Sequence, residues 1–234
     1  VITACVFVGE LVGCLFWGVV ADRHGRKLVY WLVTGLVLVG GILTCFAVNV
    51  WTYAIPRFFV GVGIGGFAIP IDMVVECTPQ SHRGKLTWMC LYAWGISSVL
   101  TNLVAWLTLD TWGWRFLAAY STVPVLLSFL SLHWVPESPR WLASHGEHER
   151  AEKVICQAAY RNGVSLPTGR FLKDHSHDHK EGDISEMFTP GLRLRTYLLI
   201  VMWVTSISTY YAAVEMDGLV FEGTQQKGIC SFDY

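Results

Sequence analysis

Charged residues are scarce in this chain of 234 residues. Asp, Glu, Lys and Arg make up only 15% of it and hydrophobic residues make up 53%, whereas soluble domains average about 25% and about 45–50%. The formal net charge is −1, so there is no excess of positive charge that would point to nucleic acid. This composition argues against a soluble domain and favours a membrane protein.

Motifs for metal binding, nucleotide binding and catalysis are also missing. The seven cysteines form no C-x-x-C pair, which argues against a disulfide framework and a zinc site. The longest polar region, residues 136–195, contains no glycine pattern of a dinucleotide site or P-loop, and no nucleophile, base and acid stand together. The cluster His175–His179 contains residues that can bind metals, but such a charge-mixed loop is more often simply solvated. We therefore expect no enzymatic activity, no cofactor and no metal site.

Long apolar runs fill most of the chain. A helix needs about 20 residues to cross the hydrocarbon core of a bilayer, and six runs have about that length or more. They are Val1–Ala21, Leu28–Val48, Trp51–Cys77, Leu86–Leu109, Phe116–Val135 and Thr196–Val214. Each run is apolar nearly all round rather than along one stripe, which is typical of membrane helices. The sequence therefore predicts an all-α fold, a polytopic membrane helical bundle.

The positive residues lie in alternate loops. The loops Asp22–Lys27 and Thr78–Lys85 hold three and two Lys or Arg, and Glu137–Arg195 holds nine, so these loops contain 14 of the 17. Cytosolic loops are rich in Lys and Arg, so we expect these three on the cytosolic side. The chain begins with Val1 inside an apolar run that lacks signal-peptide features, and we expect that an N-terminal part precedes it.

The longest polar region lies between the fifth and sixth runs. Within it, Glu147–Tyr160 is predicted to form a short amphipathic helix with Val154, Ala158 and Ala159 on its apolar side. We accordingly divide the chain into membrane helices over 1–135, a cytosolic central loop over 136–195, one more membrane helix over 196–214, and a luminal or extracellular tail over 215–234.

The sharpest motif follows the first apolar run and reads GVVADRHGRK over residues 18–27. Gly18 would let a neighbouring helix approach closely, and Gly25 would make a tight turn at low steric cost. Asp22 could accept hydrogen bonds from the N-terminus of an adjacent helix and from arginines. The three basic residues would remain at the lipid headgroups: Arg23, Arg26 and Lys27. The alternative is a generic basic anchor after a membrane helix.

The third apolar run carries a small and charged face. At 100° per residue one side of this helix presents a single narrow set of residues: Arg57, Gly61, Gly65, Ala68, Asp72 and Glu76. Charges at membrane depth normally face the protein interior or a water-filled path, so we expect this face to look inward. Pro70 should kink or loosen the helix.

Four motifs in order resemble the major facilitator superfamily of transporters. Besides residues 18–27 they are RFFVGVGIGG over 57–66, ECTPQSHRG over 76–84, and PESPRWL over 136–142, which is preceded by WGWR over 112–115. The resemblance implies a partial major facilitator fold containing family helices two to seven, and is strongest to synaptic-vesicle-2-related and organic-ion transporters. It implies a cytosolic gate, in which Glu76 and Arg83 form an ion-pair cluster. The gate residues would be Gly18, Asp22, Arg23, Gly25, Arg26, Lys27, Glu76, Arg83, Glu137 and Arg140.

Five other residues are candidates for a substrate or proton site. Glu10 is the one charge within Val1–Ala21 and lies about 18 Å along the helix from Asp22. It is either a protonatable group facing a cavity or a protonated carboxyl hydrogen-bonded between helices. Asp72 is more consistent with gating or ion pairing than with substrate contact. Arg57 could attract anionic groups or pair with an acid of another helix. Tyr210 and Tyr211 could line the cavity or belong to an interfacial aromatic belt.

The expected function is transport of a small organic solute or ion by alternating access, which could be coupled to a proton or ion. The expected partners are this solute, the lipid bilayer and the remaining helices of the same transporter, in a vesicle or plasma membrane. The 234 residues alone are not expected to transport. The alternatives are a non-transporting vesicle-membrane binding or trafficking protein with a transporter-like fold and, less consistent with the loops, a seven-helix receptor.

Overall fold

The computed structural model describes residues 2–165 and 187–227, and all regular structure in these ranges is helical. The chain divides into two units, Val1–His179 and Lys180–Tyr234, which are treated separately. The His175–His179 cluster lies outside the described residues.

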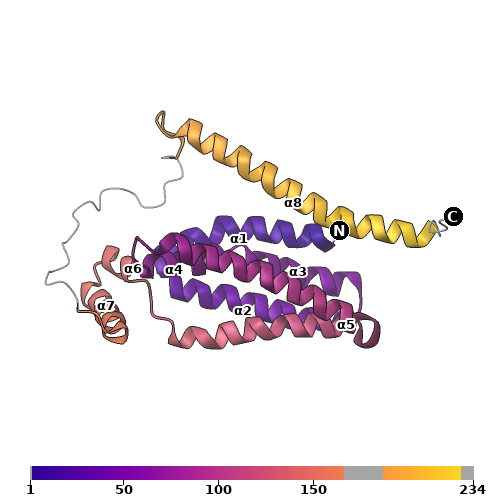
Figure 1. Ribbon diagram of the computed structural model, residues 1–234, viewed down its shortest axis with the longest axis horizontal. Coiled ribbons are helices and arrows are strands. Elements are labelled where there is room, and N and C mark those ends of the chain that lie inside the picture. The colour runs from indigo at the N-terminus through magenta and orange to yellow at the C-terminus, as the bar shows by residue number, and fades with distance from the viewer. Residues whose placement is uncertain (1, 166–186, 228–234) are drawn as a thin grey trace. The chain divides into compact units, whose positions relative to one another are not determined.

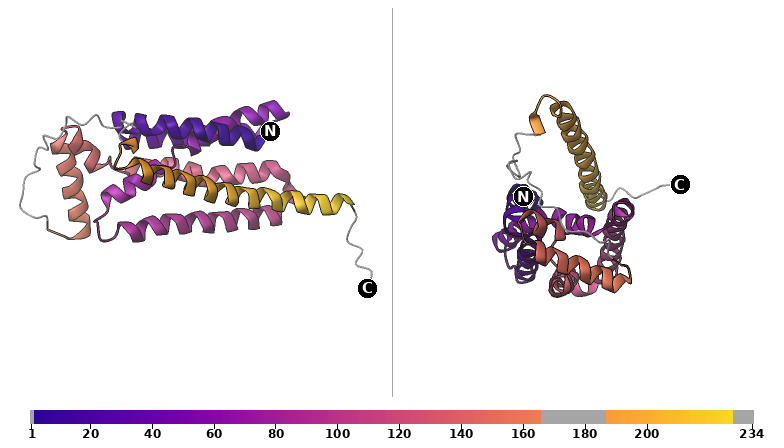
Figure 2. Two further views of the ribbon diagram at one scale, coloured as in Figure 1. Left: turned by 90° about the horizontal axis from the view of Figure 1, so that it is seen from above. Right: turned by 90° about the vertical axis from the view of Figure 1, so that its left-hand side faces the viewer.

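The first unit is a bundle of long apolar helices. They are α1 (Ile2–His24), α2 (Arg26–Cys45), α3 (Val50–Ile64), α4 (Ala68–Cys77) and α5 (Arg83–Ser131), followed by the 3-10 helix η1 (Leu132–Trp134). Figures 1 and 2 show α1, α2, α3 and both halves of α5 running alongside one another. Two short helices, α6 (Pro139–Ser144) and α7 (His148–Asn162), lie beyond one end of them. We call this the basic end, because it carries the loops rich in Lys and Arg, and the opposite end the neutral end.

Helix α5 contains two of the predicted membrane crossings. Gly113 interrupts it with a non-helical backbone (φ 72°, ψ 175°), between the apolar runs expected at Leu86–Leu109 and Phe116–Val135. In the described residues five helical segments are long and apolar enough to cross a membrane, and the segment Arg83–Trp134 has 52 residues. At about 1.5 Å per residue that segment is long enough to cross twice. The prediction of a polytopic helical membrane protein is therefore confirmed.

The third crossing is broken into α3 and α4, but not by Pro70 as expected. The interruption falls at residues 65–67, where Gly65 and Gly66 weaken the helix. Pro70 lies in the first turn of α4, where the missing N–H of proline costs little because these amides have no partner within the helix. The adjacent glycine pair, rather than the proline, places the break.

Glycines bring α1 and α3 into backbone contact. A Cβ added to Gly61 would lie 2.1 Å from the Val6 carbonyl oxygen, and one added to Gly13 would lie 2.1 Å from the Val62 carbonyl oxygen. Such close approach is possible only for small residues. The two helices therefore pack as one rigid pair.

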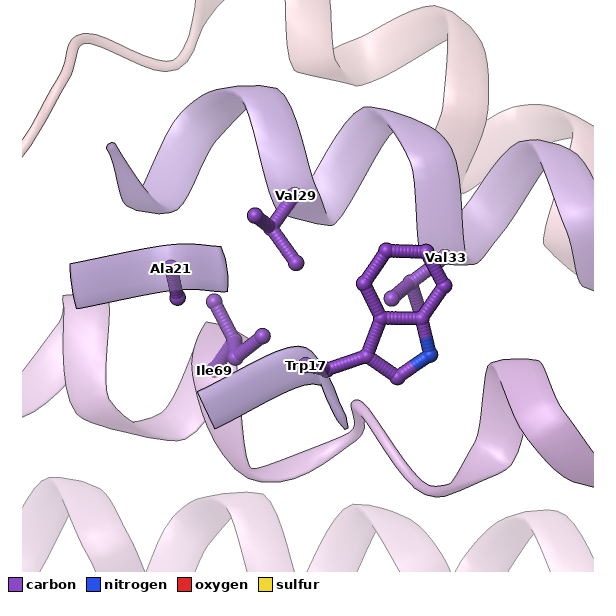
Figure 3. Packing of buried hydrophobic residues seen from close by; sticks show 5 residues of the cluster. All are labelled: Trp17, Ala21, Val29, Val33 and Ile69. Carbon is purple, nitrogen blue, oxygen red and sulfur yellow. The ribbon is translucent and has the colours of Figure 1, made fainter. Parts of the chain in front are cut away.

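A buried cluster fixes this pair to α2 and α4 near the basic end. Figure 3 shows its members: Trp17, Ala21, Val29, Val33 and Ile69. The indole Nε1 of Trp17 donates a hydrogen bond of 2.8 Å to the Val62 carbonyl, so the one polar atom of this side chain is satisfied where it is buried.

The amphipathic helix is close to its prediction, since α7 spans His148–Asn162 and ends at Gly163 in a left-handed conformation (φ 65°). Its apolar side differs, because Ala151 is fully buried and Ala158 is exposed. Helix α6, which the sequence analysis did not predict, packs against α7 and buries Leu142.

The second unit contains α8 (Arg193–Lys227), which includes the run expected at Thr196–Val214. The apolar segment that could cross a membrane is Arg193–Val214, and the helix continues beyond it into the region expected as a tail. The Thr196 hydroxyl donates a 2.8 Å hydrogen bond to the Met187 carbonyl, which folds the preceding turn against the start of α8.

Candidate functional site

The basic end gathers five charged residues from four elements into what we call the ionic cluster. Asp22 comes from the end of α1, Arg26 from the start of α2, Asp72 and Glu76 from α4, and Glu137 from the residues just before α6. Three of the four carboxylates contact the one guanidinium, and the sequence separation between the outermost members exceeds 100 residues.

Arg26 is the hub of the cluster. Its guanidinium lies 3.2 Å from Asp72 Oδ2, 3.2 Å from Glu76 Oε1 and 3.8 Å from Asp22 Oδ1. The Arg26 side chain is only 18% exposed and that of Glu76 only 10%, so the pair with Glu76 is the least weakened by solvent. Arg26 was expected to remain at the headgroups, and in the structure three carboxylates hold its guanidinium at the basic end.

Glu137 binds the N-terminus of α2. Its carboxylate accepts hydrogen bonds from the backbone N–H groups of Arg26 (3.1 Å) and Lys27 (3.1 Å), as well as from Ser138 (2.9 Å). The first amides of a helix lack partners within it and carry partial positive charge, which a carboxylate neutralises. The sequence analysis assigned such a role to Asp22; for α2 it is Glu137 that fills it.

Gly25 makes this contact possible. Its backbone lies at φ 99°, ψ 149°, a region essentially restricted to glycine. A Cβ at this position would also lie 2.6 Å from Glu137 Oε2. A glycine is therefore needed at residue 25, both for its backbone conformation and for the space that it leaves to the Glu137 carboxylate. This agrees with the tight turn predicted at Gly25.

Two residues of the PESPRWL segment were missed by the sequence analysis. Ser138 is fully buried, caps α6 and donates a 2.6 Å hydrogen bond to Glu76 Oε2. The indole Nε1 of Trp141 donates a 2.9 Å hydrogen bond to the Asp22 carbonyl. The serine before the helix-starting proline was the available signal, because Ser is a preferred N-cap residue.

The remaining predicted gate residues lie around the cluster. Arg83 was expected to pair with Glu76, but its Nε donates to the Thr78 carbonyl at the end of α4 (3.1 Å), and Arg26 takes Glu76 instead. Arg23 and Arg140 are exposed and form no ion pair with any described residue. No described atom lies within 4 Å of a Cβ added to Gly18, so the described part of the chain supplies no close neighbour there.

Glu10 lies beside the small and charged face of α3. A Cβ added to Gly65 would lie 2.5 Å from the Glu10 carbonyl oxygen and 2.5 Å from the Cys14 backbone nitrogen. The backbone of Glu10 therefore packs directly against Gly65 of α3. Glu10 is half-buried, and within residues 2–165 and 187–227 its side chain forms no hydrogen bond or ion pair.

Arg57 occupies the neutral end of the same face. It is half-buried, and among the described atoms its Nε has no hydrogen-bond partner. It borders a cavity of about 170 Å³ between α2, α3 and the second half of α5. The hydroxyls of Ser121 and Thr122 on that cavity donate to backbone carbonyls, so the guanidinium is the donor left for a ligand.

Tyr210 and Tyr211 belong to the second unit. Their rings lie edge to face with centroids 5.3 Å apart, and Tyr210 is 53% exposed.

Comparison with known proteins shows what the chain is similar to. The family profile described as "Sugar (and other) transporter" matches residues 1–216. Synaptic vesicle 2-related protein of Pongo abelii is 32% identical over 98% of this chain and 42% of its own. Organic cation/carnitine transporter 7 of Arabidopsis thaliana is 30% identical over 91% of this chain and 50% of its own.

Solved structures of a transporter are also similar to this chain. The partially occluded inward-open structure of the xylose transporter XylE from E. coli aligns with a TM-score of 0.61 and 26% identity, over 66% of this chain and 42% of that one. Another structure of XylE describes it as a proton:xylose symporter of the major facilitator superfamily. The chain spans half or less of the length of these relatives.

Proposed function

This chain belongs to the sugar (and other) transporter family, and we propose that it forms part of a secondary transporter that moves a small organic solute or ion by alternating access. In this proposal the ionic cluster is the cytosolic gate, and Glu10 and Arg57 face the solute path. The membrane would be that of a vesicle or the cell surface. The partners would be the bilayer and the other helices of the protein.

The ionic cluster is the observation that carries the proposal. One guanidinium joins α1, α2 and α4 through three carboxylates, and Glu137 joins α2 to the α6 segment. In alternating access one helix bundle rocks against another. The helices at one end of a bundle must then move together and must bind or release the helices of the other bundle. Ion pairs whose members are half exposed, as Asp22 and Asp72 are at 50% and 56%, can exchange partners at low cost. Asp72 serves here in ion pairing rather than in solute contact.

Glu10 is the candidate for proton coupling. An ionised carboxylate near the centre of a membrane helix costs about 2.5–3.5 kcal/mol, and no described cation offsets this. A carboxyl that takes up and releases a proton as the path opens to each side would couple solute movement to a proton gradient. The description of XylE as a proton symporter supports proton coupling, and the choice of Glu10 rests on its position within a membrane helix. Arg57 would attract an anionic group or pair with an acid of another helix.

Uptake by the full-length protein in proteoliposomes tests the proposal. A panel of radiolabelled sugars, organic cations and organic anions is offered with an inward proton gradient. We expect saturable uptake of at least one class. Glu10→Gln should abolish accumulation driven by the gradient while exchange of solute across the membrane continues. Asp110→Asn, an exposed acid near Gly113, is the matched control and should not change either rate.

The gate is tested by a second pair of variants. Arg26→Lys keeps the charge but loses the planar fork that reaches several carboxylates, so we expect uptake to fall by about 10-fold. Arg23→Lys, three residues earlier and exposed, should leave uptake within about two-fold. Equal effects of the two would contradict the gate. A folded protein with no uptake of any class would favour the vesicle-membrane binding or trafficking protein.

A further inference from the structure

Arg57 lies near the neutral end of α3, and an aromatic ring contacts its guanidinium. It lies in α3, which begins at Val50 at the neutral end, so about 10 Å of helix separates it from that end. Arginines this close to the membrane surface normally extend to the headgroups. Here the guanidinium carbon lies 5.2 Å from the centre of the Tyr53 ring, and Nε is buried. Tyr53 precedes Arg57 by four residues, so the two side chains are neighbours on one face of α3.

The Tyr53 ring is itself braced. Its centre lies 5.7 Å from that of Trp114 at an interplanar angle of 67°, the edge-to-face arrangement that aromatic pairs prefer. The guanidinium carbon of Arg115 lies 4.9 Å from the centre of the Trp114 ring, and its NH2 donates 2.9 Å to the Ala47 carbonyl. A continuous row thus runs from the turn between α2 and α3, through the start of the second half of α5, to Arg57.

An aromatic ring differs from a carboxylate in what it does to a cation. A ring face attracts a guanidinium through its quadrupole, but it neither neutralises the charge nor occupies all of the N–H donors. A residue held in this way stays fully charged and keeps donors for another ligand. The cavity of about 170 Å³ beside Arg57 supplies the space for that ligand.

We propose that Tyr53 is a positioning residue that, braced by Trp114, holds the Arg57 guanidinium at the cavity. The consequence for transport rests on the function proposed above. The position of the side chain does not, so the two are tested separately.

The first test measures the chemical reactivity of Arg57 in the full-length protein in lipid nanodiscs. The reagent is a charged phenylglyoxal that modifies arginines in water but does not enter the bilayer, and modification is followed site by site by mass spectrometry. In the unsubstituted protein Arg57 should react more slowly than the exposed Arg115. Tyr53→Leu should raise the rate at Arg57 by about 2- to 30-fold, the range of one cation–π contact. Tyr53→Phe, which keeps the ring, should not.

Tyr92→Leu is the matched control, because Tyr92 is 67% exposed on the first half of α5, and it should leave Arg57 unchanged. If Arg57 reacts as fast as Arg115 in the unsubstituted protein, the proposal is wrong whatever the variants do, and this measurement needs no substitution to fold. An equal rise with Tyr53→Phe and Tyr53→Leu would also overturn it.

The second test compares uptake by the same variants. Tyr53→Leu should raise KM by about 2- to 30-fold with kcat less affected, and Tyr53→Phe should restore the original value. Reactivity changes as expected without any uptake would leave the positioning role intact and overturn the proposed function. Normal uptake with no change in the reactivity of Arg57 would overturn the positioning role and leave the proposed function intact.

Discussion

Gly25 has a backbone conformation, φ 99° and ψ 149°, that side chains with a Cβ rarely adopt. We expect Gly25→Ala to lower the free energy of unfolding by about 1–3 kcal/mol, from backbone strain and from the displaced Glu137 carboxylate. Thermal unfolding in detergent measures this. Gly18→Ala is the control, since no described atom lies near a Cβ there, and alanine should leave α1 unchanged or stabilise it by up to about 1 kcal/mol. Equal losses would contradict the role of Gly25.

Glu137 provides a second prediction for a single residue. Glu137→Gln keeps an oxygen acceptor but removes the negative charge at the N-terminus of α2, which should cost about 1 kcal/mol. The effect should be local, so hydrogen exchange of the Arg26 and Lys27 amides should accelerate by about five-fold. Glu152→Gln, an exposed acid of α7, is the control. Unchanged exchange at both amides would show that the carboxylate charge does not stabilise this helix start.

The identity of these contacts was only partly predictable. The motif over residues 18–27 contains an acid and an arginine four residues apart, Asp22 and Arg26, and these two form an ion pair in the structure. Which acid binds the helix start was not readable, since Glu137 and Lys27 are 110 residues apart. The local sequence shows only that the first amides of α2 need a hydrogen-bond acceptor. The packing of α6 decides that this acceptor is Glu137.

Helices α1 and α3 are joined by backbone contact through their glycines, so we expect substitution there to separate the pair. Gly61→Ala would place a Cβ 2.1 Å from the Val6 carbonyl oxygen, and overpacking of this kind costs about 1–3 kcal/mol. The melting temperature of the purified protein should fall accordingly. Gly95→Ala, on α5 with no described atom within 4 Å, should not lower it. Tolerance of Gly61→Ala would show that α1 and α3 can move apart freely.

Most helices could be predicted from the sequence, because a long apolar run in a membrane has no other way to satisfy its backbone. Breaks and short helices were harder. The interruption at residues 65–67 depends on two adjacent glycines whose helix cost is small enough for packing to decide the outcome. Helix α6 has six residues, too few for any periodicity, and is stabilised by the Ser138 cap and its contact with α7.

The whole molecule has a definite sidedness in the charge pattern, which labelling in intact cells can test. All native cysteines of the full-length protein, including the seven in these 234 residues, are first replaced. Single cysteines are then introduced at two exposed positions, Ser81 at the basic end and Thr111 near Gly113. We expect an impermeant maleimide to label Thr111→Cys, once the protein is brought to the cell surface, and to label Ser81→Cys only after permeabilisation. The opposite pattern would invert the topology and place the ionic cluster outside the cytosol.

These 234 residues cover only part of the length of the transporters that they resemble. The matched relatives are at least about twice as long as the aligned region, and solute sites in such folds lie between two halves of the protein. The 234 residues contain the ionic cluster, Glu10 and Arg57, but only about half or less of the length of these relatives. Liposomes containing only this chain should therefore show no uptake above protein-free liposomes, while the full-length protein does. Saturable uptake by the chain alone would mean that these helices, or several copies of them, enclose a complete solute path.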